Sequence, residues 1–205
     1  MKTPYDYTAA LQTLVDKGRQ LYGPGYRIPD LEMPAVLKLL CWFLGDEQSA
    51  AAYGVSLQKG LLLSGPVGCG KSAVINILRA LCKPRWAFSI VPCHMVALSF
   101  ANDGHLALEK YTTRCWRNNR PHTICFDDLG FESNAAHFGN NNINVMLQVL
   151  AMRYDLFIHQ GMLTHVTTNL NSEELEARYG NRIRSRMREM FNLIAYPAGS
   201  TDKRT

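Results

Sequence analysis

Gly65-Pro66-Val67-Gly68-Cys69-Gly70-Lys71-Ser72 is the stretch that decides the fold of this chain of 205 residues. It has the form G-x-x-x-x-G-K-S, and it joins the apolar run 61–64 to residues 73–81, whose apolar side chains have helical spacing. Glycines let successive backbone N–H groups turn toward a phosphate, and the dipole of the following helix favours negative charge there. We expect all eight residues to bind nucleotide phosphates, with Lys71 at the β- and γ-phosphates and Ser72 on Mg²⁺.

Outward from this loop, short apolar runs alternate with longer segments of helical periodicity. The five runs span residues 61–64, 88–91, 123–126, 163–168 and 191–196. Strands with helices between them pair in parallel, and they are apolar throughout because helices cover both of their faces. The pattern predicts an α/β, doubly wound fold with a five-stranded parallel sheet and helices on both faces.

A helical segment precedes the predicted sheet. Apolar residues have helical spacing over residues 6–22 and 34–45, a shorter helix is expected at about 46–53, and Gly54 ends the segment. We therefore expect a helical N-terminal segment at 1–54 and a nucleotide-binding domain at 55–205.

The composition is that of a folded globular chain, with 47% hydrophobic and 19% charged residues, and it excludes disorder. The net charge of +5 permits nucleic-acid binding without requiring it. The longest apolar stretch, Ala35–Leu44, has about half of the roughly 20 residues that a membrane span needs. Six cysteines without a C-x-x-C pair argue against a zinc site. With no readable secretory signal, we expect a cytoplasmic protein without a membrane anchor.

Two carboxylates follow the third apolar run. Asp127 and Asp128 come directly after Thr123–Phe126, at the end of a strand that we expect to be buried. Asp127 is predicted to hold Mg²⁺, and Asp128 to orient the attacking water as the general base. The alternative is that the pair caps a turn, because Asp-Asp-Leu-Gly is also a turn sequence.

Asn169 ends the fourth run, on the edge of the sheet where open α/β folds bind their ligands. We expect it to hold the attacking water or the γ-phosphate. The alternative role is a helix cap, for which Asn171 competes, with Glu174 three residues later.

Five arginines lie in one stretch of eleven residues: Arg178, Arg182, Arg184, Arg186 and Arg188. They form either a solvated face or a site for an anionic group. Gly180 is expected to divide the segment into two helices.

These motifs together resemble the AAA+ ATPases, and most closely the DnaC/IstB-like helicase loaders and transposition helper ATPases, over residues 55–200. The loop resembles that family's Walker A motif and Asp127-Asp128-Leu129-Gly130 its Walker B motif. Thr167-Thr168-Asn169-Leu170 is similar to sensor 1, and Tyr179–Met187 to box VII, where the match places the arginine finger at Arg186.

The resemblance implies a homo-oligomer that binds ATP and Mg²⁺, in which Arg186 of one subunit completes the site of the next. It also implies a role in DNA replication or transposition, with a replicative helicase or a transposase as a partner. No C-terminal helical lid domain is expected, and Arg204 is only a weak substitute for its sensor. By the same analogy, Tyr26 and Ile28 contact the adenine.

In the initiator and loader branch, helices between the second and third strands contact single-stranded DNA. The corresponding residues here are about 94–120, which carry cations and aromatic rings: Lys110, Arg114, Arg117, Arg120, Tyr111 and Trp116. Such a mixture suits single-stranded DNA. The alternative is that the two rings pack onto the sheet.

Two other functions fit the same motifs. One is a kinase for a small molecule or nucleotide, since a phosphate loop with later arginines also suits phosphoryl transfer to an acceptor. The other is a nucleotide-gated adaptor that hydrolyses ATP weakly, because Asp128 is one methylene shorter than the glutamate common at that position.

Overall fold

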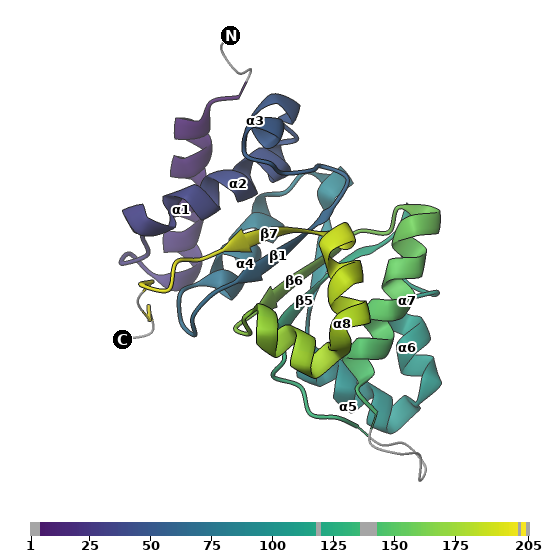
Figure 1. The fold of residues 1–205 in the computed structure, drawn as a ribbon. Helices are drawn as coiled ribbons and strands as arrows, with labels where there is room; N and C mark the ends of the chain where they lie inside the picture. Colours follow the sequence, from purple (N-terminus) through teal and green to yellow (C-terminus); the bar gives the residue numbers. More distant parts are fainter. Residues whose placement is uncertain (1–4, 118–119, 136–142, 201, 204–205) are drawn as a thin grey trace. The chain divides into compact units, whose positions relative to one another are not determined.

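The computed structural model describes residues 5–117, 120–135, 143–200 and 202–203 (Figure 1). These residues form two compact units. The first comprises residues 1–57, 63–87 and 194–205, and the second comprises 58–62 and 88–193. The predicted boundary between residues 54 and 55 stays a prediction.

The main sheet has five strands in the order β2-β5-β6-β1-β7 (Figure 1). Their bounds are β1 Gly60–Ser64, β2 Phe88–Pro92, β5 Thr123–Leu129, β6 Thr164–Thr168 and β7 Phe191–Ala195. Strand β5 pairs in parallel with both β2 and β6. The predicted α/β fold, a five-stranded parallel sheet with helices on both faces, is confirmed, and each strand lies within two residues of its expected position except at the longer end of β5.

The first unit contains the predicted N-terminal helices. They are α1 Tyr7–Tyr22, the 3₁₀ turn η1 Asp30–Glu32, α2 Met33–Leu44 and α3 Glu47–Ala52, and α4 Lys71–Leu81 and the turn η2 Pro84–Trp86 follow the phosphate loop. Asp6 and Asp46 cap α1 and α3 by accepting from backbone N–H groups three residues later, and Gly45 ends α2 in the left-handed conformation.

The described residues of the second unit include the helices α5 Cys93–Asp103, α6 His105–Tyr111, α7 Val145–Gln160 and α8 Ser172–Met190. Helix α5 packs on β2 and β5, and α7 packs beside α8 (Figure 1). A short antiparallel hairpin joins β3 Trp116–Arg117 to β4 Arg120–Pro121. Helix α8 bends at Gly180, whose φ is 79°, so the predicted division of this segment is confirmed.

Strands β1 and β6 meet closely at one point in the second unit. A Cβ added to Gly60 would lie 1.6 Å from the carbonyl oxygen of Thr164, so only glycine fits there. The next N–H group, on Leu61, donates to Nδ1 of His165 over 3.1 Å. Burial lowers the pKa of His165 to about 3, so the imidazole is neutral at physiological pH and its Nδ1 can accept this bond.

Arg153 of α7 is fully buried, which the sequence does not indicate. Its guanidinium donates to Thr164 Oγ1 over 2.7 Å and to the carbonyl oxygens of Tyr111, His122 and Leu163 over 2.7 to 3.2 Å. Burial lowers the pKa of this group to about 10, so it remains charged at neutral pH. Arg153 therefore joins α7 to the end of α6 and to the segments that lead into β5 and β6.

In the part of the chain that the structure describes, no helix has both the length and the apolar character needed to cross a bilayer.

Candidate functional site

The phosphate loop joins β1 to α4 in the first unit, as the motif predicts. Gly68 and Gly70 have φ values of 79° and 93°, in the left-handed region that glycine adopts without strain. The Lys71 side chain lies back across the loop, where Nζ donates to the carbonyl oxygens of Gly65 and Pro66 over 2.9 and 2.7 Å. The ammonium group is therefore positioned at the loop by the loop's own backbone.

The other loop residues have distinct environments. Cys69 is fully buried, and its sulfur lies 3.6 Å from Lys71 Nζ, whereas Val67 is exposed at the tip of the loop. Ser72 lies in the first turn of α4. Lys71 and Ser72 thus lie at the start of the helix, as expected, and the phosphate and magnesium roles of residues 65–72 stay predictions.

The C-terminal segment runs along this loop, a contact that the sequence does not indicate. The Tyr196 N–H donates to Ser64 O over 2.7 Å, and the Lys203 N–H donates to Gly68 O over 3.1 Å. A Cβ on Gly68 would lie 2.1 Å from a carboxylate oxygen of Asp202, so the end of the Asp202 side chain lies against the loop at this position. Arg204, predicted as a substitute for a sensor residue, lies outside the described residues.

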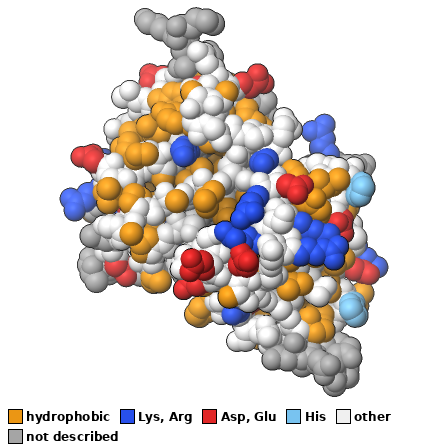
Figure 2. All heavy atoms as spheres, viewed as in Figure 1, with side chains coloured by type: hydrophobic (Ala, Val, Ile, Leu, Met, Phe, Trp, Pro, Cys, Tyr) orange, Lys and Arg blue, Asp and Glu red, His pale blue; other side chains and the backbone are white. Residues whose placement is uncertain are grey.

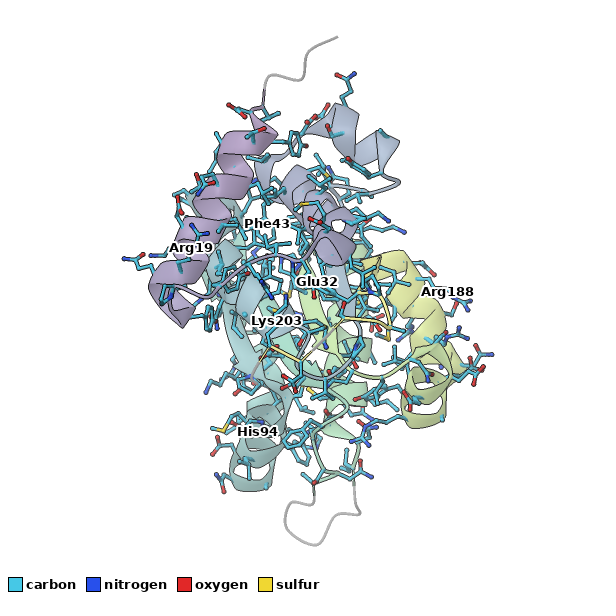
Figure 3. All side chains as sticks on the ribbon, turned by 90° about the vertical axis from the view of Figure 1, so that its left-hand side faces the viewer. Arg19, Glu32, Phe43, His94, Arg188 and Lys203 are labelled. Atoms are coloured by element: carbon cyan, nitrogen blue, oxygen red, sulfur yellow. The ribbon has the colours of Figure 1, made fainter. Side chains whose placement is uncertain are left out.

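Lys203 also connects the loop to the N-terminal segment. Its ammonium group forms an ion pair with Glu32 of η1, whose side chain is buried (Figure 3). The ring of Tyr26, a predicted adenine contact, packs on Gly18 of α1 and stacks with Tyr22. The adenine roles of Tyr26 and Ile28 stay predictions.

In the second unit, the two predicted carboxylates lie at the end of β5 and share one partner. Thr167 Oγ1 of β6 donates to Asp127 Oδ1 over 2.5 Å and accepts from the Asp128 N–H over 2.9 Å. Asp128 has a φ of 56°, and it is the one non-glycine residue with positive φ in the described ranges. Such a backbone conformation is strained and needs support from its surroundings, which Thr167 supplies.

The turn after Asp128 is held by a second residue that the sequence analysis missed. Glu132 is buried, and its Oε2 accepts from the Gly130 N–H over 2.8 Å, while its Oε1 accepts from the Tyr179 hydroxyl. Arg178 pairs with the same carboxylate and also donates to the Glu132 carbonyl oxygen. The sequence signal that could have indicated this contact was weak: a glutamate soon after a buried strand, and an adjacent Arg-Tyr pair much later in the chain.

Asn171, not Asn169, caps α8. The Asn171 side chain accepts from the N–H groups of Glu173 and Glu174, and Glu174 accepts in return from the Asn171 N–H, which is a complete capping box. The competing cap role considered for Asn169 is therefore filled by its neighbour. Asn169 is exposed just beyond β6, and its catalytic role stays a prediction.

The five arginines of α8 have different environments, and Lys and Arg side chains gather over this helix in Figure 2. Arg178 and Arg184 pair with Glu132 and Glu176, while Arg182 and Arg188 are exposed. The predicted finger, Arg186, lies over the ring of Tyr154 at 4.6 Å from the ring centre, and its Nη2 is 4.0 Å from Asp155 Oδ1. These contacts are weak enough for Arg186 to exchange them for an anionic group.

The aromatic rings proposed for DNA binding differ in exposure. Tyr111 is buried and packs edge-on against Phe126 of β5, so the alternative reading, packing on the sheet, is correct for this ring. Trp116 is 46% exposed, and its indole N–H donates to the Thr113 carbonyl oxygen. Trp116 is therefore the ring of this pair that a base could reach.

The sequence and the structure were compared with those of known proteins. A search with the sequence finds no matching protein-family model and no matching curated protein. Among solved structures, the chain is similar to the DnaC helicase loader, with a TM-score of 0.58 and 16% identity over 84% of this chain and 93% of the other. The chain has an AAA+ fold.

Two further solved structures are similar over a comparable part of this chain. AMPPCP-bound DnaA from Aquifex aeolicus has a TM-score of 0.52 and 17% identity, covering 83% of this chain and 48% of DnaA. A DNA replication initiation factor has a TM-score of 0.52 and 16% identity, covering 84% of this chain and 48% of the factor. The AAA+ fold predicted from the resemblance is thus confirmed.

Proposed function

We propose that this chain is an AAA+ ATPase that binds Mg²⁺-ATP and acts in DNA replication as a helicase loader, or as a transposition helper, in the cytoplasm. The phosphate loop carries the proposal, because its glycines have the required left-handed backbone and Lys71 is already held at the loop. Of the similar structures, one is a helicase loader and another is of the AMPPCP-bound form of DnaA, AMPPCP being an ATP analogue.

Each motif has a role in this proposal. Residues 65–72 bind the phosphates, and the hydroxyl of Ser72 and the carboxylate of Asp127 are hard oxygen ligands of the kind that suits Mg²⁺. Bound Mg²⁺ supplies positive charge to the β- and γ-phosphates. Asp128 and Asn169 orient a water: its oxygen bonds to the γ-phosphorus as the bond to the bridging oxygen breaks, and its proton passes to Asp128.

Arg186 acts in trans in this proposal, on the ATP of a neighbouring copy. Its guanidinium leaves the Tyr154 ring and Asp155 and pairs with the γ-phosphate, where an arginine finger contributes about 10³ to 10⁵ in turnover. The isolated subunit would therefore be nearly inactive, and turnover would rise with assembly.

Single-stranded DNA is the proposed nucleic-acid ligand. Trp116, Arg117 and Arg120 are exposed on the β3–β4 hairpin, whereas Arg114 pairs with Glu109 and Lys110 lies over the Tyr111 ring. Stacking on Trp116 and contacts from the exposed arginines suit a flexible strand whose binding weakens with salt. A replicative helicase or a transposase is the proposed protein partner.

The test is ATP hydrolysis with and without single-stranded DNA in the wild type, Lys71→Ala and Arg186→Ala. Each variant alone should be inactive, and mixing the two should restore turnover, because a Lys71→Ala subunit can supply the finger to an intact loop. Arg19→Ala, which removes an exposed arginine of α1, is the matched control and should behave as the wild type. Failure of the mixture to regain activity would exclude a shared site.

The nucleotide-gated adaptor is the second candidate, because the Asp127 carboxylate already accepts a short bond from Thr167 and Asp128 has the shorter side chain. Tight ATP binding with negligible turnover, even when the protein is assembled on DNA, would favour it. Transfer of the γ-phosphoryl group to an acceptor molecule, with ADP formed and no inorganic phosphate released in the absence of the acceptor, would instead indicate a kinase.

A further inference from the structure

Glu132 is a buried carboxylate that joins two functional parts of the second unit. Its side chain is 2% exposed, and three groups contact it: the N–H of Gly130, the hydroxyl of Tyr179 and the guanidinium of Arg178. A buried carboxylate with a single cationic partner depends on all of its hydrogen bonds, because each lost donor leaves charge without compensation. The arrangement is therefore sensitive to movement of any one donor.

On one side, Glu132 holds the turn that follows Asp128. The Phe131 N–H donates to the Asp128 carbonyl oxygen over 3.1 Å, and the Gly130 N–H inside this turn donates to Glu132. Gly130 has a φ of 103° and lies so close to Leu170 that an added Cβ would be 2.5 Å from it. These contacts restrain the turn, and the turn helps to keep Asp128 in its positive-φ conformation.

On the other side, Glu132 holds α8 at its bend. Arg178 and Tyr179 immediately precede Gly180, where the helix departs from helical geometry, and the Arg178 carbonyl oxygen accepts from Asn144 at the start of α7. The second half of α8 carries the proposed finger, Arg186. Gly180 has a φ of 79°, in the left-handed region that glycine adopts without strain, and a Cβ added there would meet no side chain within 4 Å.

We infer that Glu132 is a positioning residue that couples the Asp128 carboxylate to the arginine-bearing half of α8. Arg178 and Tyr179 directly adjoin the bend, so a neighbouring copy that binds Arg186 and moves this half of α8 pulls on both residues through the backbone of Gly180. Glu132 transmits this pull to the Gly130 turn. Assembly thereby sets the orientation of the general base as well as supplying the finger. This inference rests on the proposed function, since it assigns a route by which assembly reaches Asp128.

The test uses Tyr179→Phe, which removes one donor to Glu132 and keeps the ring in the core. Tyr7→Phe is the matched control: its hydroxyl also donates to a buried carboxylate, Asp46, but in the first unit. Hydrogen exchange of the full-length protein is measured at residues 128–132. We expect about fivefold faster exchange in Tyr179→Phe, the effect of losing one hydrogen bond, and none in Tyr7→Phe.

Steady-state turnover and nucleotide affinity are measured on the same proteins as a function of protein concentration. Tyr179→Phe should bind nucleotide as the wild type does, while the stimulation of turnover by assembly falls about tenfold or more. Unchanged exchange at 128–132 would overturn the coupling, and so would unchanged stimulation. A wild type without turnover would refute the proposed function alone, because the exchange measurement still tests the link through Glu132.

Glu132→Gln is the second variant and keeps the size of the side chain. The amide can still accept from Gly130 or Tyr179 but loses the ion pair with Arg178. We expect it to fold and to reproduce the loss of stimulation. A Glu132→Gln protein that is stimulated normally would contradict the coupling.

Discussion

Replacing Thr167 with valine removes the hydroxyl that Asp127 and Asp128 share, and it changes little else in size. Thr167 is fully buried in β6, so water cannot take the place of the lost group. The change deletes one bond from a backbone N–H and one to a carboxylate, at 2.9 and 2.5 Å. A neutral bond contributes about 1 kcal/mol and a bond to a charged group about 1.5–3 kcal/mol, so the free energy of unfolding should fall by about 3 kcal/mol.

Thermal unfolding and ATP turnover measure the two consequences. For a chain of this size the melting temperature should fall by about 6–12 °C. Turnover should fall at least tenfold, because Asp128 loses the support for its strained backbone, while nucleotide affinity should stay within about twofold, since the phosphate loop is unchanged.

Two variants control this experiment. Thr13→Val removes an exposed threonine hydroxyl that bonds to the Ala9 carbonyl in α1, and it should change stability by less than about 0.5 kcal/mol. Thr167→Ser keeps the hydroxyl and should restore most of both properties. A Thr167→Val protein that melts and turns over ATP as the wild type does would refute the role assigned to this residue.

Three other substitutions test the fold that carries the site. Gly60→Ala should lower the free energy of unfolding by about 3 kcal/mol or more, because the added Cβ would lie 1.6 Å from a carbonyl oxygen of β6. Gly25→Ala, where an added Cβ has no atom within 4 Å, should be tolerated. Chemical denaturation measures both variants. Arg153→Met should cost about 3–5 kcal/mol in the same assay, since three carbonyl oxygens lose the fully buried guanidinium that donates to them. Arg19→Met should cost less than about 1 kcal/mol. For pH, the folded protein has a pKa of about 3 at His165 against 6.5 when unfolded, so the unfolded state binds the proton first on acidification. The free energy of unfolding should therefore fall as the pH drops below about 6.5, and His165 should account for roughly 3 kcal/mol of this loss at pH 4. His165→Gln, measured by chemical denaturation at each pH, should remove this contribution. An unchanged pH dependence in His165→Gln would show that the histidine is not the cause.

The parts of the fold that follow from local physics could be predicted from the sequence. The phosphate loop depends on glycines within eight consecutive residues, and the five strands appear as apolar runs because both of their faces are buried. The sequence narrows the cap of α8 to Asn169 or Asn171, because a cap acts within three residues of the side chain. These patterns can be recognised in the sequence because each is contained in a short segment.

The partners of the candidate site depended on the tertiary structure. Thr167 is 39 residues from Asp128 in the chain, and Tyr179 is 47 residues from Glu132, so no local pattern indicates that either pair is in contact. The burial of Tyr111 depended likewise on which face of α6 meets β5. The sequence alone determined where the glycine-rich loop that we propose to bind phosphate lies, since this motif is contained in eight consecutive residues. Only the folded chain decided how the carboxylates and the arginine helix are held, because buried polar groups must find hydrogen-bond partners wherever the packing places them.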